Sequence, residues 1–236
     1  MQITRIEELA QKKRRVYIDD SYAFMLYDKD IAIYSLREGQ EISDLLYNKI
    51  IKDTVLRRAR QKAIAVLERS DRTEAEIRRK LKEGMYTETI IDSVITYLVS
   101  LHYLDDLRYA ENYVRTRASQ TSARELSNKL LQKGVSKDTI ALAIASVEEE
   151  LSFSSQSSGE DALSREQSAA VLALRKKLNG RTSIDYQTRQ KLIAYMLRKG
   201  YRMNDISTAF DVLEVSFGAE EDSFSTTSFF DLSDNF

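Results

Sequence analysis

Arginine and lysine are the residues in this chain whose types and spacing best predict chemistry, and that chemistry is the binding of phosphates or carboxylates. Arginine presents a planar fork of donors and lysine a compact charge, so both bind oxyanions well. The candidates are Arg72, Arg78, Arg79, Lys80, Lys82, Arg108, Arg115, Arg117, Arg124, Lys129 and Lys133. Each of them alone is better explained as an ordinary solvated charge on a helix, so the prediction rests on the whole set.

Residues for catalysis or metal binding do not form a comparable set. The sequence has a single histidine, His102, and no cysteine, and its glycines are scattered rather than gathered in a phosphate-binding loop. Asp105 and Asp106 stand together, but carboxylates at a helix start are better explained as caps, which the helix dipole favours. We therefore predict no enzyme activity, no cofactor and no metal site. His102 is interpreted as a structural or surface residue that tolerates a positive φ at a helix end.

Two stretches of the chain differ strongly in charge, although the net charge is only −1. From Lys52 to Lys82 there are eleven Lys or Arg against five Asp or Glu, a net of about +6, whereas Glu214 to Phe236 holds six acidic residues and no basic ones. The first balance suits a polyanion or an acidic protein surface, and the second suits a disordered tail. The basic run Lys12–Arg15 is equally well explained as a solvated arm and as a phosphate contact.

Composition predicts a folded protein of the cytoplasm. The 236 residues include 42% hydrophobic residues, enough for a core. The absence of cysteine fits a reducing compartment, and we see no apolar run of transmembrane length and no signal peptide. We therefore expect a cytoplasmic localisation and no membrane partner. A monomer is the simplest expectation if the chain is a linear repeat protein.

The candidate cations belong to a pattern that occurs more than once. Thr73-x-x-Glu76 and Ser122-x-x-Glu125 both have the form of a capping box, in which a hydroxyl and a carboxylate satisfy amides at a helix start. Each box opens a short basic stretch. The sequence therefore predicts two equivalent helices in tandem units.

Three glycines give the repeat its register. Gly84, Gly134 and Gly200 each close a basic helix, where a left-handed residue is common. Apolar residues then recur at six, ten and thirteen positions past each glycine, which is the period of a helix. These residues are Ile90, Val94 and Tyr97, then Ile140, Ile144 and Val147, and then Ile206, Phe210 and Leu213.

These patterns predict a mainly α fold, with three tandem three-helix repeats in an elongated, curved array and a small β-containing amino-terminal extension. The predicted domains are the extension at 1–52, repeats at 53–104, 105–151 and 167–215, a serine-rich flexible linker at 152–166, and an acidic, aromatic, disordered tail at 216–236.

The extension is predicted to contain a small antiparallel sheet or hairpin. Its β-prone runs are Val16–Ile18, Tyr22–Tyr27 and Ile31–Leu36, with a turn at Asp19–Ser21. Ser43 or Asp44 is then expected to cap a helix that leads toward the first repeat.

An ordered set of short motifs resembles a known family. The set is Tyr103-Leu104-Asp105-Asp106, Arg108-Tyr109-Ala110, Arg115-x-Arg117, Arg124-Glu125-Leu126, Lys129-Leu130 and Lys133-Gly134-Val135. It is similar to the second-repeat signature of the RecX family, regulators of the RecA recombinase. The run from Arg72 to Ile77 is similar to the first repeat of that family, and the likeness covers about residues 55 to 215. The extension resembles that of Gram-positive members, whereas His102 replaces a usual glycine.

The resemblance implies a function and its partners. A RecX protein binds the RecA filament on single-stranded DNA and mainly inhibits its growth, ATP hydrolysis, strand exchange and co-protease activity, in recombination and the SOS response. It implies weak binding to single-stranded and double-stranded DNA. Tyr103, Tyr109 and Tyr113 adjoin the face of their helix that the apolar pattern predicts to be buried, so we expect them in the core or between repeats rather than stacked on bases. Two alternatives remain: a helix-turn-helix-like nucleic-acid-binding regulator that acts without RecA, and an adaptor that only bridges proteins.

Overall fold

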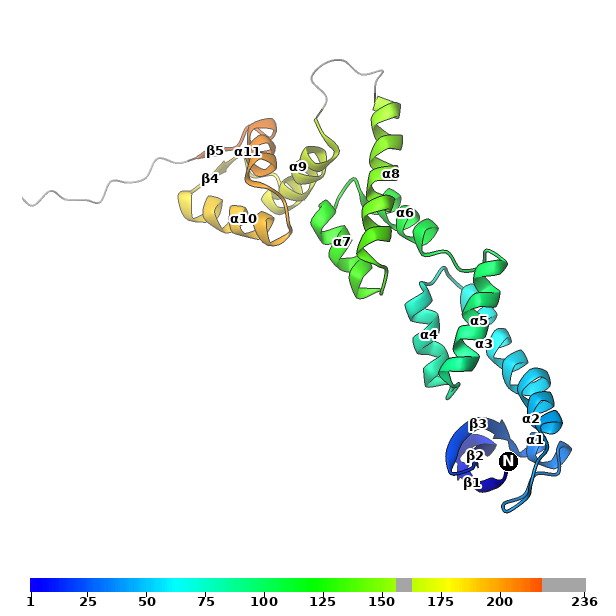
Figure 1. Cartoon of the computed structure of the whole chain (residues 1–236). Helices are drawn as coiled ribbons and strands as arrows, with labels where there is room; N and C mark the ends of the chain where they lie inside the picture. The colour runs from blue at the N-terminus through cyan, green and yellow to red at the C-terminus, as the bar shows by residue number, and fades with distance from the viewer. Residues whose placement is uncertain (156–162, 218–236) are drawn as a thin grey trace, which may run out of the picture. The chain divides into compact units, whose positions relative to one another are not determined.

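The computed structural model describes residues 1–155 and 163–217, and these residues are mostly helical (Figure 1). Contacts within the chain divide it into two compact units. The first unit comprises residues 1–116 and 127–155, and the second comprises residues 117–126 and the chain from 156 onward. The middle of the predicted linker, residues 156–162, and the predicted tail from residue 218 lie outside the described residues.

A three-stranded antiparallel sheet begins the first unit. Its strands, in spatial order, are β1 (Ile3–Leu9), β2 (Lys13–Ile18) and β3 (Ser21–Tyr27). A short 3-10 turn at residues 10–12 joins the first two strands. Asp19 and Asp20, at φ 48° and 62°, make the two-residue turn between β2 and β3. Aspartate tolerates this left-handed conformation better than most residues do, so the predicted turn is confirmed.

One face of this sheet belongs to the core of the first unit. Val16, Ile18, Phe24 and Leu26 alternate along β2 and β3, and all four side chains are buried. Successive residues of a strand point to opposite faces, so this alternation fixes which face is buried.

The predicted strand at Ile31–Leu36 is wrong, because helix α1 (Asp28–Ile33) occupies most of that stretch and the third strand of the sheet is β1. The Asp30 carboxylate accepts a hydrogen bond from the backbone N–H of Tyr27 at 2.8 Å and forms an ion pair with Arg58. These polar contacts begin a helix where the apolar residues alone favoured a strand.

A continuous helical stretch leads from the extension into the first repeat. Helix α2 (Asp44–Ile50), a π-helical segment (Ile51–Leu56) and helix α3 (Arg57–Leu67) follow one another without a break. Ser43 Oγ accepts a hydrogen bond from Leu46 N at 3.2 Å, so the predicted cap is confirmed.

Eight further helices make up the repeats. They are α4 (Glu74–Glu83) and α5 (Glu88–Ser100), which follow α3; α6 (Asp106–Arg117), α7 (Ala123–Gln132) and α8 (Lys137–Ser155); and α9 (Arg165–Leu178), α10 (Tyr186–Arg198) and α11 (Met203–Val212). Six of the nine apolar residues predicted from the glycine register are buried. The other three, Tyr97, Ile144 and Leu213, are half-buried.

Both ends of the predicted linker at 152–166 belong to helices. Helix α8 continues to Ser155, because serine lowers helix propensity only modestly and no glycine or proline interrupts this part of the chain. Helix α9 begins at Arg165, since Ser164 Oγ accepts a hydrogen bond from Gln167 N at 3.2 Å and caps it.

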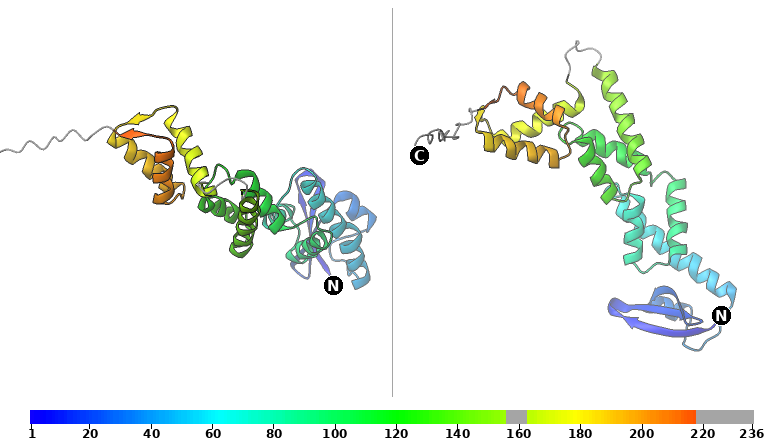
Figure 2. Two further views of the ribbon diagram at one scale, coloured as in Figure 1. Left: turned by 90° about the horizontal axis from the view of Figure 1, so that it is seen from above. Right: turned by 60° about the vertical axis from the view of Figure 1, so that its left-hand side comes forward.

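The predicted tail begins with an ordered strand. β5 (Ser216–Phe217) pairs in parallel with β4 (Ser183–Ile184), and Figure 2 shows the two short strands beside the helices of the third repeat. Phe217 is held by an edge-to-face contact with Phe210, at 5.5 Å between ring centroids, and by the Arg189 guanidinium 4.4 Å above its ring. These aromatic contacts order a stretch that charge and serine content alone assigned to the tail.

Candidate interaction surface and repeat junctions

A buried threonine joins the start of α4 to the turn after α7. Thr73 Oγ1 donates a hydrogen bond to the carbonyl oxygen of Lys133 at 2.6 Å and accepts one from Glu76 N at 3.2 Å. The Glu76 carboxylate accepts a hydrogen bond from Thr73 N at 3.3 Å, which completes the predicted capping box. One side chain therefore caps α4 and satisfies a carbonyl of the next repeat.

Charged groups complete this first junction. Lys133 Nζ lies 3.3 Å from Glu76 Oε1 and 5.6 Å from the centre of the Tyr109 ring. Hydrogen bonding to Tyr109 raises the pKa of Lys133, burial offsets part of this increase, and hydrogen bonding to Glu76 raises it further. Asp106 Oδ1 accepts a hydrogen bond from Glu74 N at 2.9 Å. The candidate cation Lys133 thus forms a contact between the first and second repeats.

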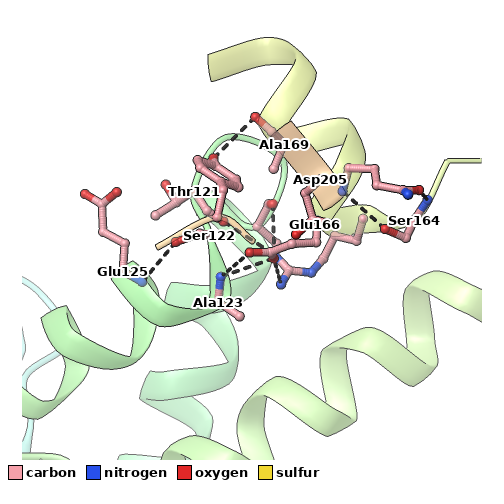
Figure 3. Close-up of polar contacts among 12 residues, drawn as sticks. Thr121, Ser122, Ala123, Glu125, Ser164, Glu166, Ala169 and Asp205 are labelled. Atoms are coloured by element: carbon pink, nitrogen blue, oxygen red, sulfur yellow. Dashed lines mark hydrogen bonds and ion pairs between the residues drawn. The ribbon is translucent and has the colours of Figure 1, made fainter. Parts of the chain in front are cut away.

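The second unit contains a junction of the same chemistry (Figure 3). Ser122 Oγ donates to the carbonyl oxygen of Lys199 at 2.5 Å and accepts from Glu125 N at 3.1 Å. Lys199 Nζ lies 3.0 Å from Glu125 Oε1, and both oxygens of Glu166 lie 3.2 Å from Ala123 N. The hydroxyl, the lysine, the carboxylate of the capping box and the helix-starting carboxylate of the first junction each have an equivalent in the second.

A glycine allows the close approach at each junction. Gly134 has φ +86°, and a Cβ added to it would lie 2.2 Å from the Cβ of Ala75. Gly200 has φ +93°, and an added Cβ would lie 2.7 Å from the Cβ of Arg124. Both positions therefore exclude a side chain by conformation and by space.

The extension caps the turn of the first repeat in a related way. The Tyr22 hydroxyl donates a hydrogen bond to the carbonyl oxygen of Met85, and burial raises the pKa of Tyr22 to about 12. Met85, at φ 63°, is the left-handed residue of this turn, whereas Gly84 has an ordinary φ of −81°. The prediction that Gly84 is equivalent to Gly134 is therefore wrong. Counting four residues from Leu81 aligns the turn at Met85.

Most of the predicted cations are engaged with carboxylates or carbonyl oxygens. Arg72 pairs with Glu76, Arg78 with Glu74 and Asp92, Lys80 with Glu83, Lys82 with Glu88, and Arg115 with Glu150, while Arg108 donates to the carbonyl oxygen of His102. Exposed pairs of this kind contribute little to stability, because water screens the two charges. An anionic partner could replace the carboxylate at small cost.

The remaining candidates differ in exposure. Arg79 is exposed and has no ion pair with any residue in the described part of the chain. Arg117 and Arg124 are exposed and Lys129 is half-buried. Helix α4 brings together four candidates, Arg78, Arg79, Lys80 and Lys82, and is the densest cationic element among them.

The aromatic residues before and within α6 are only partly as predicted. Tyr103 is 55% exposed, so its assignment to the core is wrong; the neighbouring Leu104 is the buried residue. His102 adopts φ 55°, which confirms the predicted left-handed conformation just after the end of α5. Tyr109 and Tyr113 are half-buried and stack on each other with their ring centroids 6.3 Å apart.

The two adjacent aspartates cap different helices. Asp105 Oδ1 accepts a hydrogen bond from Arg108 N at 3.0 Å and caps α6, whereas Asp106 caps α4 through Glu74 N. Sequence reasoning assigned both to α6. Within the described residues, no three His, Cys, Asp or Glu side chains are arranged to hold a metal ion.

Sequence reasoning missed three residues that join parts of the chain: Lys199, Glu166 and Tyr22. The first two had a signal, because Lys199-Gly200 repeats the Lys133-Gly134 pair and Glu166 stands near the start of its helix as Asp106 does. Tyr22 had none, since its partner is a backbone carbonyl 63 residues away.

We expect the Asp106→Asn variant to be more stable than wild type by an amount that grows as the pH rises. Burial raises the pKa of Asp106, with the charges of Glu74 and Asp105 adding to it, although the Glu74 N–H opposes the change. The carboxyl of Asp106 therefore ionises at a lower pH in the unfolded chain, where its pKa is about 3.8, than in the folded protein. The stability that protonated Asp106 contributes is lost as the pH rises from this value through the pKa of the folded state. Asparagine retains an acceptor oxygen without this loss. Urea unfolding of both proteins from pH 3.5 to 7 measures the difference, and a difference that falls with rising pH would contradict the assignment.

Comparison with known proteins places these repeats in one family. Profiles of the first, second and third RecX three-helix domains match residues 59–98, 105–144 and 165–210. The chain is 33% identical over 210 residues to the regulatory protein RecX of Clostridium acetobutylicum, covering 86% of this chain and 92% of that one. The chain belongs to the RecX family. It is also 31% identical over 209 residues to RecX of Clostridium botulinum strain Eklund 17B, covering 84% and 90%.

The RecX fold is shared as well. A crystal structure described as regulatory protein RecX superposes with a TM-score of 0.54 at 22% identity and covers 89% of this chain and 98% of that one. The RecX domain matches contain both junction hydroxyls, Thr73 in the first and Ser122 in the second. Among the described residues, no helix combines the length and apolar character needed to cross a membrane.

Proposed function

We propose that this RecX protein binds the filament that a RecA recombinase forms on single-stranded DNA, and limits filament growth, ATP hydrolysis, strand exchange and co-protease activity. The observation that carries the proposal is the ordered match to all three RecX three-helix domains. Relatives at 33% and 31% identity bear the name regulatory protein RecX, which supports a regulatory role.

The repeat junctions suit a ligand that repeats along its length. Thr73 with Lys133, and Ser122 with Lys199, hold neighbouring elements through the same contacts. Repeats joined through the same contacts resemble the units of solenoid proteins, which bind extended partners. A filament offers equivalent sites at regular intervals too.

The mechanism that we propose requires no catalysis. A ligand shifts a conformational or assembly equilibrium only by binding one state more tightly than another. The protein would bind the assembled recombinase in a state that cannot add subunits or hydrolyse ATP. Exposed cations of α4 would pair with acidic groups of the filament: Arg79, which has no ion pair in the described part of the chain, and Lys82, which would exchange its pair with Glu88 for one with the partner.

ATP hydrolysis by the recombinase of the same host, on single-stranded DNA, tests this proposal. We expect the protein to reduce hydrolysis at amounts well below one copy per recombinase monomer. The double substitution Arg79→Glu and Lys82→Glu should raise the half-inhibiting concentration about tenfold or more, since a hydrogen bond to a charged group contributes about 1.5 to 3 kcal/mol. Lys49→Glu, at an exposed position of α2 outside the repeats, is the matched control and should inhibit normally.

Two results would contradict the proposal. Hydrolysis that is unchanged at equimolar protein would exclude inhibition of the recombinase. Sequence-specific binding to duplex DNA without any recombinase, at an affinity above that for the filament, would favour a helix-turn-helix-like regulator instead.

A further inference from the structure

The outer face of the amino-terminal sheet combines cations with tyrosines. On β2, Lys13, Arg15 and Tyr17 alternate with the buried residues of the same strand, so they share the face opposite the core. Lys13 pairs with Tyr27 of β3, and Tyr17 pairs with Tyr22. The Arg5 guanidinium of β1 stacks 4.0 Å above the ring of Tyr17.

The first repeat forms a wall beside this face. A pocket of about 430 Å³ is lined by Arg15, Tyr17 and Tyr22 of the sheet and by Met85, Tyr86 and Glu88 from the turn before α5 and the first residue of α5. Lys62 of α3 lies 6.0 Å from the centre of the Tyr86 ring. A Cβ added to Gly84 would lie 2.5 Å from Lys62 Nζ. The glycine thus leaves room for an ammonium group.

Lys62 is a half-buried cation at this place. Burial lowers the pKa of Lys62, the charge of Glu83 opposes this, and the charges of Lys13 on β2 and Lys80 on α4 lower the pKa further. Lys62 Nζ has no hydrogen bond or ion pair with any residue that the structure describes. Like charges held close together cost energy that an anion between them removes.

The carboxylates near this face are already paired. Glu7 lies 3.5 Å from Arg15 and accepts a hydrogen bond from the Tyr17 hydroxyl at 3.1 Å. Glu83 lies 2.7 Å from Lys80. Glu88 forms an ion pair with Lys82. None of them forms a direct ion pair with Lys62, so its ammonium group remains available to an anion.

We propose that the outer face of the sheet, together with Lys62 and Tyr86, is a binding site for single-stranded nucleic acid. Lys13, Lys62 and Arg15 would contact successive phosphates, and the half-buried ring of Tyr86 would stack on a base. Sites for single strands characteristically combine a basic groove with aromatic platforms. An acidic protein segment would use the cations but gain little from the aromatic rings, so the tyrosines favour nucleic acid. The site does not depend on the recombinase.

The test is binding of a fluorescein-labelled oligothymidylate to the full chain, followed by fluorescence anisotropy over a range of salt concentrations with no recombinase present. Lys13→Ala with Lys62→Ala should weaken binding about tenfold or more at low salt. It should also reduce the slope of log affinity against log salt by about 1.4, the loss of two phosphate contacts on a single strand. Lys49→Ala with Lys52→Ala, which removes two lysines from the helical stretch before α3, should change affinity less than threefold.

A second variant separates stacking from charge. Tyr86→Leu should weaken binding about fivefold or more while leaving the salt slope unchanged, because stacking releases no counterions. Thermal unfolding of Lys13→Ala with Lys62→Ala should show an unchanged or higher midpoint, since the substitutions remove repulsion. The same affinity and slope for wild type and both site variants would overturn the proposal. Tighter binding to poly-glutamate than to the oligonucleotide would overturn it as well. Neither result bears on inhibition of the recombinase, which is measured separately.

Discussion

Replacing Gly134 with alanine is expected to lower the free energy of unfolding of the first unit by about 2 to 5 kcal/mol. Two costs add. A residue with a Cβ pays about 1 to 2 kcal/mol for the left-handed conformation, and a clash in a packed contact costs about 1 to 3 kcal/mol. Both apply here, because φ is +86° and the new Cβ would lie 2.2 Å from that of Ala75. Urea unfolding followed by circular dichroism measures the loss.

Gly39 provides the matched control for this substitution. It lies in the same unit with φ +77°, and an added Cβ would meet nothing within 4 Å. Gly39→Ala should therefore show only the conformational cost. Ala75→Gly should restore part of the stability of Gly134→Ala, although glycine within α4 itself costs about 1 kcal/mol. Equal losses for the two glycine substitutions, with no coupling to Ala75, would show that the close approach is unimportant.

Asp30→Ala is expected to cost about 3 kcal/mol at neutral pH. The Asp30 side chain is 5% exposed, accepts from Arg58 NH2 at 2.8 Å and from Tyr27 N at 2.8 Å, and ties the extension to α3. Removing one member of a buried ion pair costs about 3 to 5 kcal/mol. The lower end applies, because Arg58 remains 30% exposed.

The pH dependence of this loss has a definite sign. Burial alone would raise the pKa of Asp30, but hydrogen bonds from Arg58 and from the Tyr27 N–H lower it below its ordinary 3.8. The stabilisation by Asp30 is therefore complete at a pH above the pKa that Asp30 has in the unfolded chain. It is lost as the pH falls through the lower pKa of the folded protein. Asp28→Ala is the control, since the pair of Asp28 with Arg14 is more exposed and should contribute less to stability. If both substitutions cost the same from pH 7 to pH 3, Asp30 does not anchor the extension.

Local patterns predicted much of this fold because they act over a few residues. The caps at Thr73 and Ser43 and the turn at Asp19 depend on neighbours in the sequence, and the structure contains them. The apolar register after each glycine likewise predicted which faces of α5, α8 and α11 are buried, because a helical period is local.

Contacts over long distances could not be predicted in the same way. Thr73 donates to a carbonyl 60 residues away and Ser122 to one 77 residues away, and no local pattern encodes those partners. The same limit explains why Lys133 was assigned to a surface rather than to a junction. At Gly84 the sequence misled, because this glycine makes room for Lys62 instead of providing the left-handed residue.

The most direct test of the proposed function is the length of recombinase filaments on single-stranded DNA, imaged by electron microscopy while the protein is added at about one copy per ten or more recombinase monomers. If the protein limits filament growth, a few bound copies prevent the addition of many recombinase subunits. We therefore expect filaments several-fold shorter than those formed without the protein. The Gly134→Ala variant, whose first junction is weakened, should shorten them less. Filaments of unchanged length with wild-type protein, even at one copy per recombinase monomer, would contradict the account.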